Sequence, residues 1–152
     1  MSSGSGINFD EPISKMVKRL EIEHKEFETK LAEVKICVED DNIIHAAEII
    51  RSISDKIIHH AVEEEARLMR VIMHKAKEES VESVKIMQEH NWVMSFLKNR
   101  LITLEKVSAQ SDTDECEQAK NDLNEFVDNL RAHFKEEEQI IFPLTLRVER
   151  ID

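Results

Sequence analysis

Apolar residues recur at every third or fourth position along four long stretches of this 152-residue chain. That spacing is the period of an α-helix with one buried face. The chain has only two glycines and two prolines, so few residues within the stretches oppose a helix. Polar breaks separate the stretches at 39–42 (EDDN), 77–80 (KEES) and 108–114 (SAQSDTD). The pattern predicts an all-α protein, built as an up-down-up-down four-helix bundle.

Several residues mark where these helices should begin and end. We expect Asp10 to cap the first helix, with Pro12 in its first turn, and Ser80 to cap the third. Pro143 is expected to kink or end the fourth helix. The opening MSSGSG is typical of a linker. We therefore expect residues 1–11 to form a flexible segment and residues 12–150 to form one bundle domain.

Charge, hydropathy and cysteine usage exclude several classes of protein. A formal net charge of −11 argues against nucleic acid or an anionic membrane as a partner, because both require a basic face. No apolar run approaches the roughly 20 residues of a membrane span. Cys37 and Cys116 form no CxxC pair, and the first residues lack the features of a signal peptide. We expect a cytoplasmic protein without disulfides.

Each expected buried row contains a histidine, and two of the rows also contain a glutamate one turn later. Val84 belongs to the expected row of the third helix, and Ile140 to that of the fourth. The polar residues in the rows are His24, His60, Glu64, His90, His133 and Glu137. A single buried histidine is usually hydrogen-bonded and carries no function. Six such groups would each cost about 1–3 kcal/mol if unsatisfied, whereas shared cations satisfy all of them.

The composition of this group favours a pair of metal ions. It contains imidazoles and carboxylates without a thiolate, which argues against structural zinc, calcium and magnesium. Carboxylates can bridge two ions, so four histidines and two glutamates divide evenly over a pair. Iron is the preferred metal, with manganese or zinc as substitutes. Two alternatives stay open: His59 with Glu63 could replace His60 with Glu64, and Glu138 could replace Glu137.

The two halves of the chain repeat one another. HAVEEEARLM (60–69) and HFKEEEQIIF (133–142) share a histidine, three glutamates and two closing apolar residues. LEIEH (20–24) and IMQEH (86–90) each end in Glu-His. The sequence therefore describes a helical hairpin used twice, each hairpin supplying one isolated histidine and one His-x3-Glu pair.

These motifs resemble the hemerythrin-like, HHE cation-binding family over about residues 12–147. The resemblance implies a non-haem di-iron centre with a bridging oxo or hydroxo group, bridged also by Glu64 and Glu137. Dioxygen, peroxide or nitric oxide would be its small-molecule ligand. The oxygen carriers of the family have a second histidine one turn after the third-helix ligand, where this chain has Met94. They also end their last motif with His-x4-Asp, whereas this chain has glutamate at both the fourth and fifth places.

The missing histidine leaves about one open octahedral position on each iron. Such a site suits reaction with dioxygen, peroxide or nitric oxide, including a peroxidase or catalase-like activity, better than reversible carriage. The alternatives are an iron-sensing, iron-storage or iron-donor protein, or an interaction module that the metal only stabilises. Ferritin-like iron oxidation is disfavoured because ferroxidase sites are dominated by carboxylates.

Overall fold

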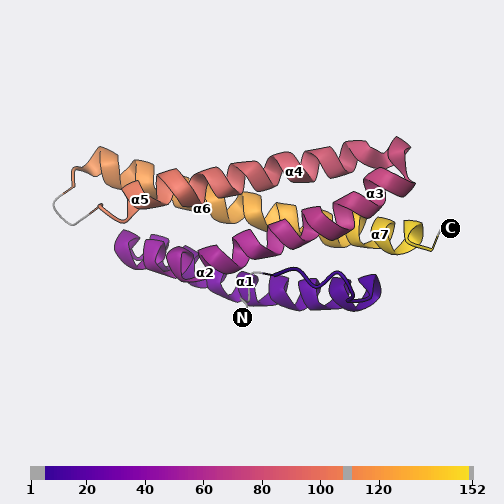
Figure 1. Cartoon of the computed structure of the whole chain (residues 1–152). Helices are drawn as coiled ribbons and strands as arrows, with labels where there is room; N and C mark the ends of the chain where they lie inside the picture. The colour runs from indigo at the N-terminus through magenta and orange to yellow at the C-terminus, as the bar shows by residue number, and fades with distance from the viewer. Residues whose placement is uncertain (1–5, 108–110, 151–152) are drawn as a thin grey trace.

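The computed structural model describes residues 6–107 and 111–150, and in these ranges it contains helices and no strand. Four helical rods lie side by side (Figure 1). The first is α1 (Ile13–Glu39), and the second joins α2 (Ile43–Glu63), the π-helical segment η1 (Glu64–Met69) and α3 (Arg70–Lys75). After the short 3₁₀ turn η2 (Lys77–Glu79), the third joins α4 (Ser80–Ser95), the π-helical η3 (Phe96–Arg100) and α5 (Leu101–Leu104). The fourth joins α6 (Thr113–Glu136), the π-helical η4 (Glu137–Ile141) and α7 (Phe142–Val148). The all-α class is confirmed.

The polar breaks supply caps for two of the rods. The side chain of Asn42 accepts a hydrogen bond from the backbone N–H of His45, and Asp112 caps α6 through the N–H of Glu115. The expected cap at Asp10 is wrong, because the extended backbone of Pro12 leads directly into α1 and no side chain caps this end. The expected cap at Ser80 is also wrong. Ser80 is the first residue of α4, because the 3₁₀ turn η2 directly precedes this helix, and no side chain caps its start. Residues 108–110 of the expected loop lie outside the described ranges.

The N-terminal residues that are described are tied to the second rod. The guanidinium of Arg67 donates to the backbone carbonyl oxygens of Asn8 at 2.9 Å and Glu11 at 2.8 Å. It also lies over the ring of Phe9, 5.9 Å from the centroid. Of the segment that we expected to be flexible, residues 1–5 lie outside the described part of the chain.

The apolar core is divided into two clusters. One includes Phe27, Leu31 and Leu130. The other includes Leu20, Leu68 and the buried apolar residues of η4 and α7. His24 lies between Leu20 of one cluster and Phe27 of the other along α1. The polar group in the buried rows therefore occupies the layer between two apolar blocks. Among the described residues, none of the helices is both long enough and apolar enough to cross a membrane.

Two expectations about the buried rows need correction. Val84 is 41% exposed, because α4 turns Ser83 and Ile86 inward in its place. Ile140 is 40% exposed and Ile141 is buried, because the wider turn of η4 moves the inward row by one residue. Of the two outcomes expected at Pro143, a kink or an end, the end does not occur, since the fourth rod continues to Val148. In an α-helix, the ring of a proline clashes with the backbone carbonyl group four residues earlier. Here that carbonyl group lies within the π-helical segment η4.

Candidate metal centre

The six polar residues of the buried rows meet at the middle of the bundle. Each rod supplies one histidine, from α1, α2, α4 and α6, and the second and fourth rods each add a glutamate. The histidines are 2–4% exposed and both glutamates are 0% exposed. The members are His24, His60, Glu64, His90, His133 and Glu137. The structure thus brings together the six preferred ligand candidates of the sequence.

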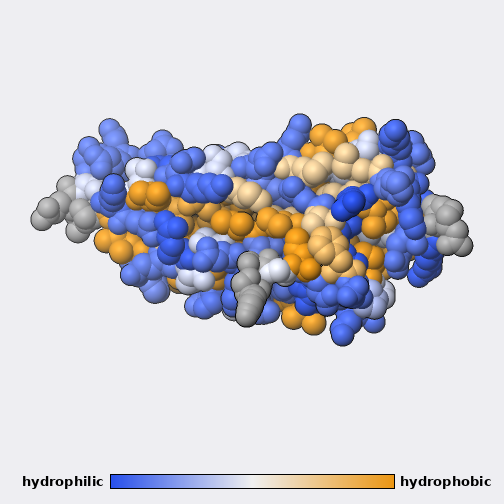
Figure 2. Space-filling view, viewed as in Figure 1, coloured by the Kyte–Doolittle hydropathy of each residue, from blue (hydrophilic) through white to orange (hydrophobic). Residues whose placement is uncertain are grey.

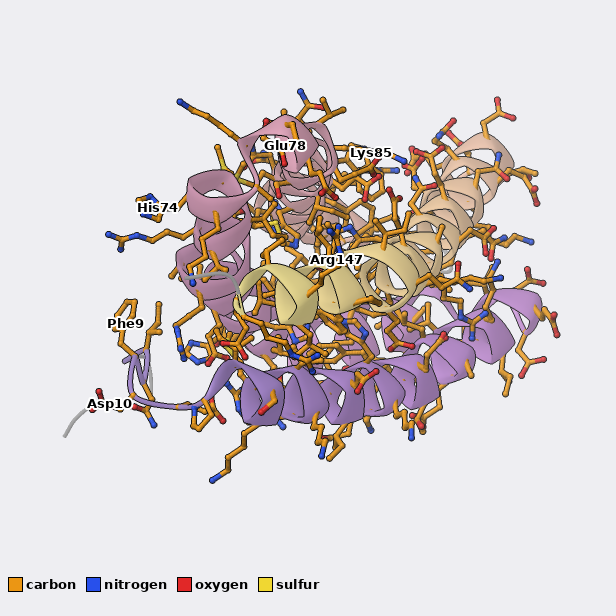
Figure 3. The ribbon with its side chains drawn as sticks, turned by 90° about the vertical axis from the view of Figure 1, so that its right-hand side faces the viewer. Phe9, Asp10, His74, Glu78, Lys85 and Arg147 are labelled. Atoms are coloured by element: carbon orange, nitrogen blue, oxygen red, sulfur yellow. The ribbon has the colours of Figure 1, made fainter. Side chains whose placement is uncertain are left out.

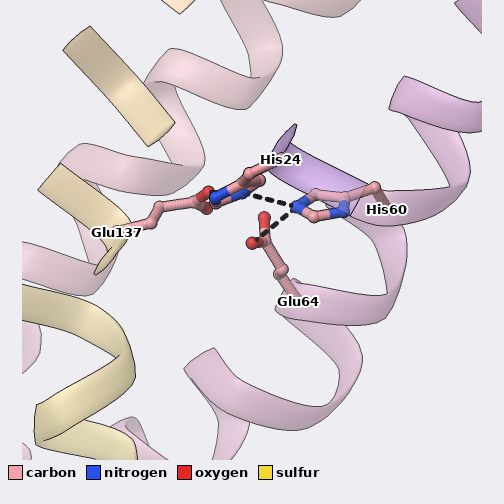
Figure 4. A group of neighbouring side chains, drawn as sticks. All are labelled: His24, His60, Glu64 and Glu137. Atoms are coloured by element: carbon pink, nitrogen blue, oxygen red, sulfur yellow. Dashed lines mark hydrogen bonds and ion pairs between the residues drawn. The ribbon is translucent and has the colours of Figure 1, made fainter. Parts of the chain in front are cut away.

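His24 and His60 form the first half of the centre together with the two glutamates (Figure 4). The Nε2 atoms of the two rings lie 3.0 Å apart. Nε2 of His24 is 3.1 Å from Oε1 of Glu137, and Nε2 of His60 is 3.0 Å from Oε2 of Glu64. One ligand atom from each of the four residues therefore faces a common point, and these atoms all lie within 4.8 Å of one another.

His90 and His133 form the second half with the same two glutamates. Nε2 of His90 is 3.0 Å from Oε1 of Glu64 and 3.4 Å from Oε2 of Glu137. Nε2 of His133 is 3.2 Å from Oε2 of Glu137. Each glutamate thus presents one oxygen to the first half and the other oxygen to the second. A carboxylate in this position can bridge two cations.

An outer carboxylate holds the other ring nitrogen of every histidine. Two of these contacts stay within one hairpin: Glu23 with Nδ1 of His60 and Glu89 with Nδ1 of His133, each at 2.7 Å. The other two cross between hairpins: Glu138 with Nδ1 of His24 at 2.7 Å, and Glu65 with Nδ1 of His90 at 2.8 Å. The repeat in the sequence is therefore also a repeat in the hydrogen bonding.

These outer contacts decide which atoms remain for a ligand. A neutral imidazole that donates from Nδ1 to a carboxylate carries a lone pair at Nε2. Two such lone pairs, on His24 and His60, would face one another at 3.0 Å, an arrangement that requires a positive charge between them. Both carboxylate oxygens of Glu64 and of Glu137, with Nε2 of His90, are buried without a hydrogen-bond partner among the described residues. This donor set fits a pair of cations.

Protons can balance the charge when metal is absent. Burial alone would lower the pKa of His60, but Glu64 and Glu23 raise it to about 10. Against the same burial, Glu137, Glu64 and Glu65 raise the pKa of His90 to about 11. Burial would also lower the pKa of His133, but the carboxylates of Glu137 and Glu89 raise it to about 9. Burial would raise the pKa of Glu137, but His133, His24 and His90 hold it well below its usual value.

Metal binding is therefore expected to release protons at neutral pH. A metal requires neutral imidazoles, whereas His60, His90 and His133 are protonated in the metal-free protein at pH 7. Calorimetric titration with metal in buffers of different ionisation enthalpy measures the release, and metal affinity should rise with pH. The same shifts stabilise the metal-free fold fully below about pH 6.5, the ordinary histidine pKa, and this contribution is lost as pH rises through 9–11. Metal binding without proton release would contradict this assignment.

The alternative pair, His59 and Glu63, does not join the centre. Nε2 of His59 is 3.4 Å from Glu63, whose carboxylate instead accepts two hydrogen bonds from Arg19, at 2.7 and 3.1 Å. The side chain of His59 is 34% exposed and lines a groove on the outside of the α1–α2 pair. Glu138, the other alternative, contributes an outer contact to His24.

Sequence reasoning missed the outer carboxylates Glu23, Glu65 and Glu89. The signal was present, because a glutamate precedes both His24 and His90 and follows both Glu64 and Glu137. On an isolated helix these positions lie at the edge of the buried row and resemble solvated charges. Only the packing of neighbouring rods shows that each one reaches a histidine of a different rod.

The two glutamates of the centre each begin a π-helical segment, Glu64 that of η1 and Glu137 that of η4. A π-turn inserts an extra residue into a helix and is frequently found at functional sites. Here the matched segments place Glu64 and Glu137 at equivalent points of the two hairpins.

Comparison with known proteins agrees with this geometry. The family model of the hemerythrin HHE cation-binding domain matches residues 15–145. The match covers most of the chain, which therefore belongs to the hemerythrin HHE cation-binding domain family. No curated protein and no solved structure matches the chain.

Proposed function

We propose that this chain is a non-haem di-iron protein that binds or reacts with dioxygen, peroxide or nitric oxide, on an up-down-up-down bundle. His24 and His60 would hold one ion, His90 and His133 would hold the other, and Glu64 and Glu137 would be shared by the two. The observation that carries the proposal is that both candidate cation groups share the same two glutamates. Membership of a cation-binding family supports it independently.

Iron suits the donor set better than the other common metals. Imidazole nitrogens with carboxylate oxygens fit iron, whereas calcium and magnesium prefer oxygen donors and structural zinc prefers four ligands, often thiolates. A bound pair of iron ions, with a bridging oxo or hydroxo group, would supply a redox centre at these residues.

The chain's own residues hold and isolate that centre. Glu23, Glu65, Glu89 and Glu138 keep the Nδ1 protons in place, and so they turn each Nε2 lone pair toward a metal. The apolar clusters on both sides exclude bulk water, which strengthens the electrostatic interactions within the layer. Met94 is half-buried one turn after His90, and its thioether offers no imidazole to occupy an open position.

Anaerobic purification followed by metal analysis tests the proposal. We expect two iron ions per chain at full loading, and near-ultraviolet absorption bands of an oxygen-bridged diferric pair after oxidation. Dioxygen, hydrogen peroxide and nitric oxide are then added separately, and the spectrum is followed. One ion per chain at saturation, or an iron-loaded protein without these bands, would overturn the di-iron assignment.

A further inference from the structure

The outer carboxylates of the metal centre differ in whether a cation contacts them. Hydrophilic side chains cover much of the face shown in Figure 2. Of the lysines and arginines that the structure describes, only Arg19 forms an ion pair with one of the four outer carboxylates. Nη1 of Arg19 donates to Oε2 of Glu23 at 3.0 Å, and Oε1 of the same carboxylate holds Nδ1 of His60 at 2.7 Å. Arg19 is therefore linked through one carboxylate to a ligand candidate of the first half.

Two further carboxylates hold Arg19 in place. Its Nη1 and Nη2 atoms donate to the two oxygens of Glu63 at 3.1 and 2.7 Å. Its Nε and Nη2 atoms donate to the two oxygens of Glu11 at 3.2 and 2.9 Å. The side chains of Glu63 and Glu11 are only 6% and 11% exposed. Two-pronged contacts of this kind fix the plane of a guanidinium group, so the contact with Glu23 is more than a pairing of mobile surface side chains.

The second hairpin has a lysine at the position that matches Arg19. Positions of the two hairpins match when they lie equally far from the corresponding histidines, which are His24 with His90 and His60 with His133. By this count Lys85 matches Arg19, and Glu136 matches Glu63. Lys85 points from α4 toward the fourth rod (Figure 3), where its Nζ atom is 2.9 Å from Oε1 of Glu136. The ion pair between Arg19 and Glu63 is therefore repeated in the second hairpin.

The contact between the cation and the outer carboxylate is not repeated. Glu89 matches Glu23 and holds Nδ1 of His133 at 2.7 Å, but no lysine or arginine of the described residues forms an ion pair with it. A guanidinium group presents several donors in a flat fork, whereas an ammonium group is a compact charge. Arg19 can therefore bind Glu23 together with other carboxylates, while Lys85 pairs with one carboxylate of the fourth rod.

The cation changes how strongly Glu23 acts on its histidine. A carboxylate that accepts the Nδ1 proton of a metal-binding imidazole raises the basicity of that ligand. Arg19 at the other carboxylate oxygen draws away part of the negative charge, so His60 gains less basicity from Glu23 than His133 gains from Glu89. A metal ion with a less basic ligand keeps more positive charge, and its reduction potential is higher.

We propose that Arg19 is a positioning residue that makes the two metal positions unequal, so that the ion of the first half would be reduced before the ion of the second half. The inference rests on the proposed function, and it assigns the order in which the two ions of that centre are reduced. Each step takes up one electron from an added reductant and converts one ferric ion to a ferrous ion. Arg19 acts through Glu23 and contacts no metal itself.

Spectroelectrochemical titration of the oxidised, iron-loaded protein tests the proposal, because it measures the first and the second reduction potential separately. Arg19→Lys copies the second hairpin: it keeps a positive charge beside Glu63 and removes the guanidinium fork from Glu23. We expect the first reduction potential to fall by at least about threefold in the equilibrium constant, which is about 28 mV for one electron. The difference between the two potentials should narrow by the same amount.

Lys85→Arg is the reciprocal change, and it guards against simple misfolding because the side chain of Lys85 is 55% exposed. A guanidinium group at this position can reach Glu89 as well as Glu136, so the second reduction potential should rise and the difference should again narrow. Glu11→Gln is the control. Arg19 then keeps its contact with Glu23 and loses a competing anion, so the difference between the potentials should not narrow. Iron content and thermal midpoint are measured for each variant.

Two results would overturn the inference. The first is a difference between the potentials that narrows by less than about threefold in either Arg19→Lys or Lys85→Arg, at two irons per chain. The second is a narrowing in Glu11→Gln as large as that in Arg19→Lys, because disturbance of the ion-pair cluster alone would then account for the effect. An unaltered protein that takes up no iron pair would instead refute the proposed function.

Discussion

Glu137→Ala is expected to abolish metal binding at both positions of the centre. The carboxylate of Glu137 faces His24 with Oε1, and it faces His90 and His133 with Oε2. Removing it deprives each ion of one ligand and leaves imidazolium groups without their partner. Metal analysis after dialysis against free iron should find less than about one ion per chain. Removal of an outer hydrogen-bond partner lowers metal affinity by only about 10–100-fold, so the loss in Glu137→Ala should be larger. Glu64→Ala should behave in the same way.

Neighbouring glutamates provide graded controls for this experiment. Glu138→Ala removes only the hydrogen bond to Nδ1 of His24, so we expect about 10–100-fold weaker binding that higher iron concentrations restore. Glu63 and His59 lie outside the centre, so Glu63→Ala and His59→Ala should leave the metal content unchanged. Thermal unfolding of the metal-free variants shows whether a loss of metal reflects a missing ligand or a destabilised fold.

Two results would refute the sharing of Glu137. A Glu137→Ala protein that keeps one tightly bound ion would show that the glutamate serves only one half. If His59→Ala lost as much metal as His60→Ala, the ligands of the second rod would be displaced by one residue.

The inner ligands could be predicted from the sequence because they break a rule that the sequence makes visible. A helix buries apolar residues, so His24, His60 and Glu64 are conspicuous in a row of leucine and isoleucine. The same argument fails for Glu65 and Glu138, whose side chains are 34% and 40% exposed. On their own helices they look like ordinary surface charges, and their partners belong to rods far away in the sequence.

Register errors in the buried rows have a different cause. Val84 and Ser83 both fit a helical period that passes through His90, and hydrophobicity favoured the valine. The structure buries Ser83, whose hydroxyl has no hydrogen-bond partner among the described residues. Ile140 was misplaced because nothing in a helical period anticipates the π-helical turn of η4.

Met94→His is expected to slow the reaction with peroxide that we propose for the di-iron centre. Met94 follows His90 by one helical turn, so an imidazole there can reach the ion of the second half. The matched residue of the first half is Glu28, which forms an ion pair with Arg131 at 3.0 Å and supplies no further ligand to the centre. In the proposed di-iron centre, the substitution would therefore add a ligand on the His90–His133 side only.

The measurement compares peroxide consumption and reversible dioxygen uptake in wild type and Met94→His, at matched iron content. We expect peroxide turnover to fall by at least about tenfold, since the open position drives it, and dioxygen to be retained longer. Met94→Leu is the control, because it keeps an apolar side chain of similar volume and should react as wild type does. Reversible dioxygen binding with negligible peroxide turnover in the wild type would make the protein a carrier or sensor, despite the methionine at this place. Unchanged turnover in Met94→His, with iron content intact, would instead place the reactive position on the His24–His60 side.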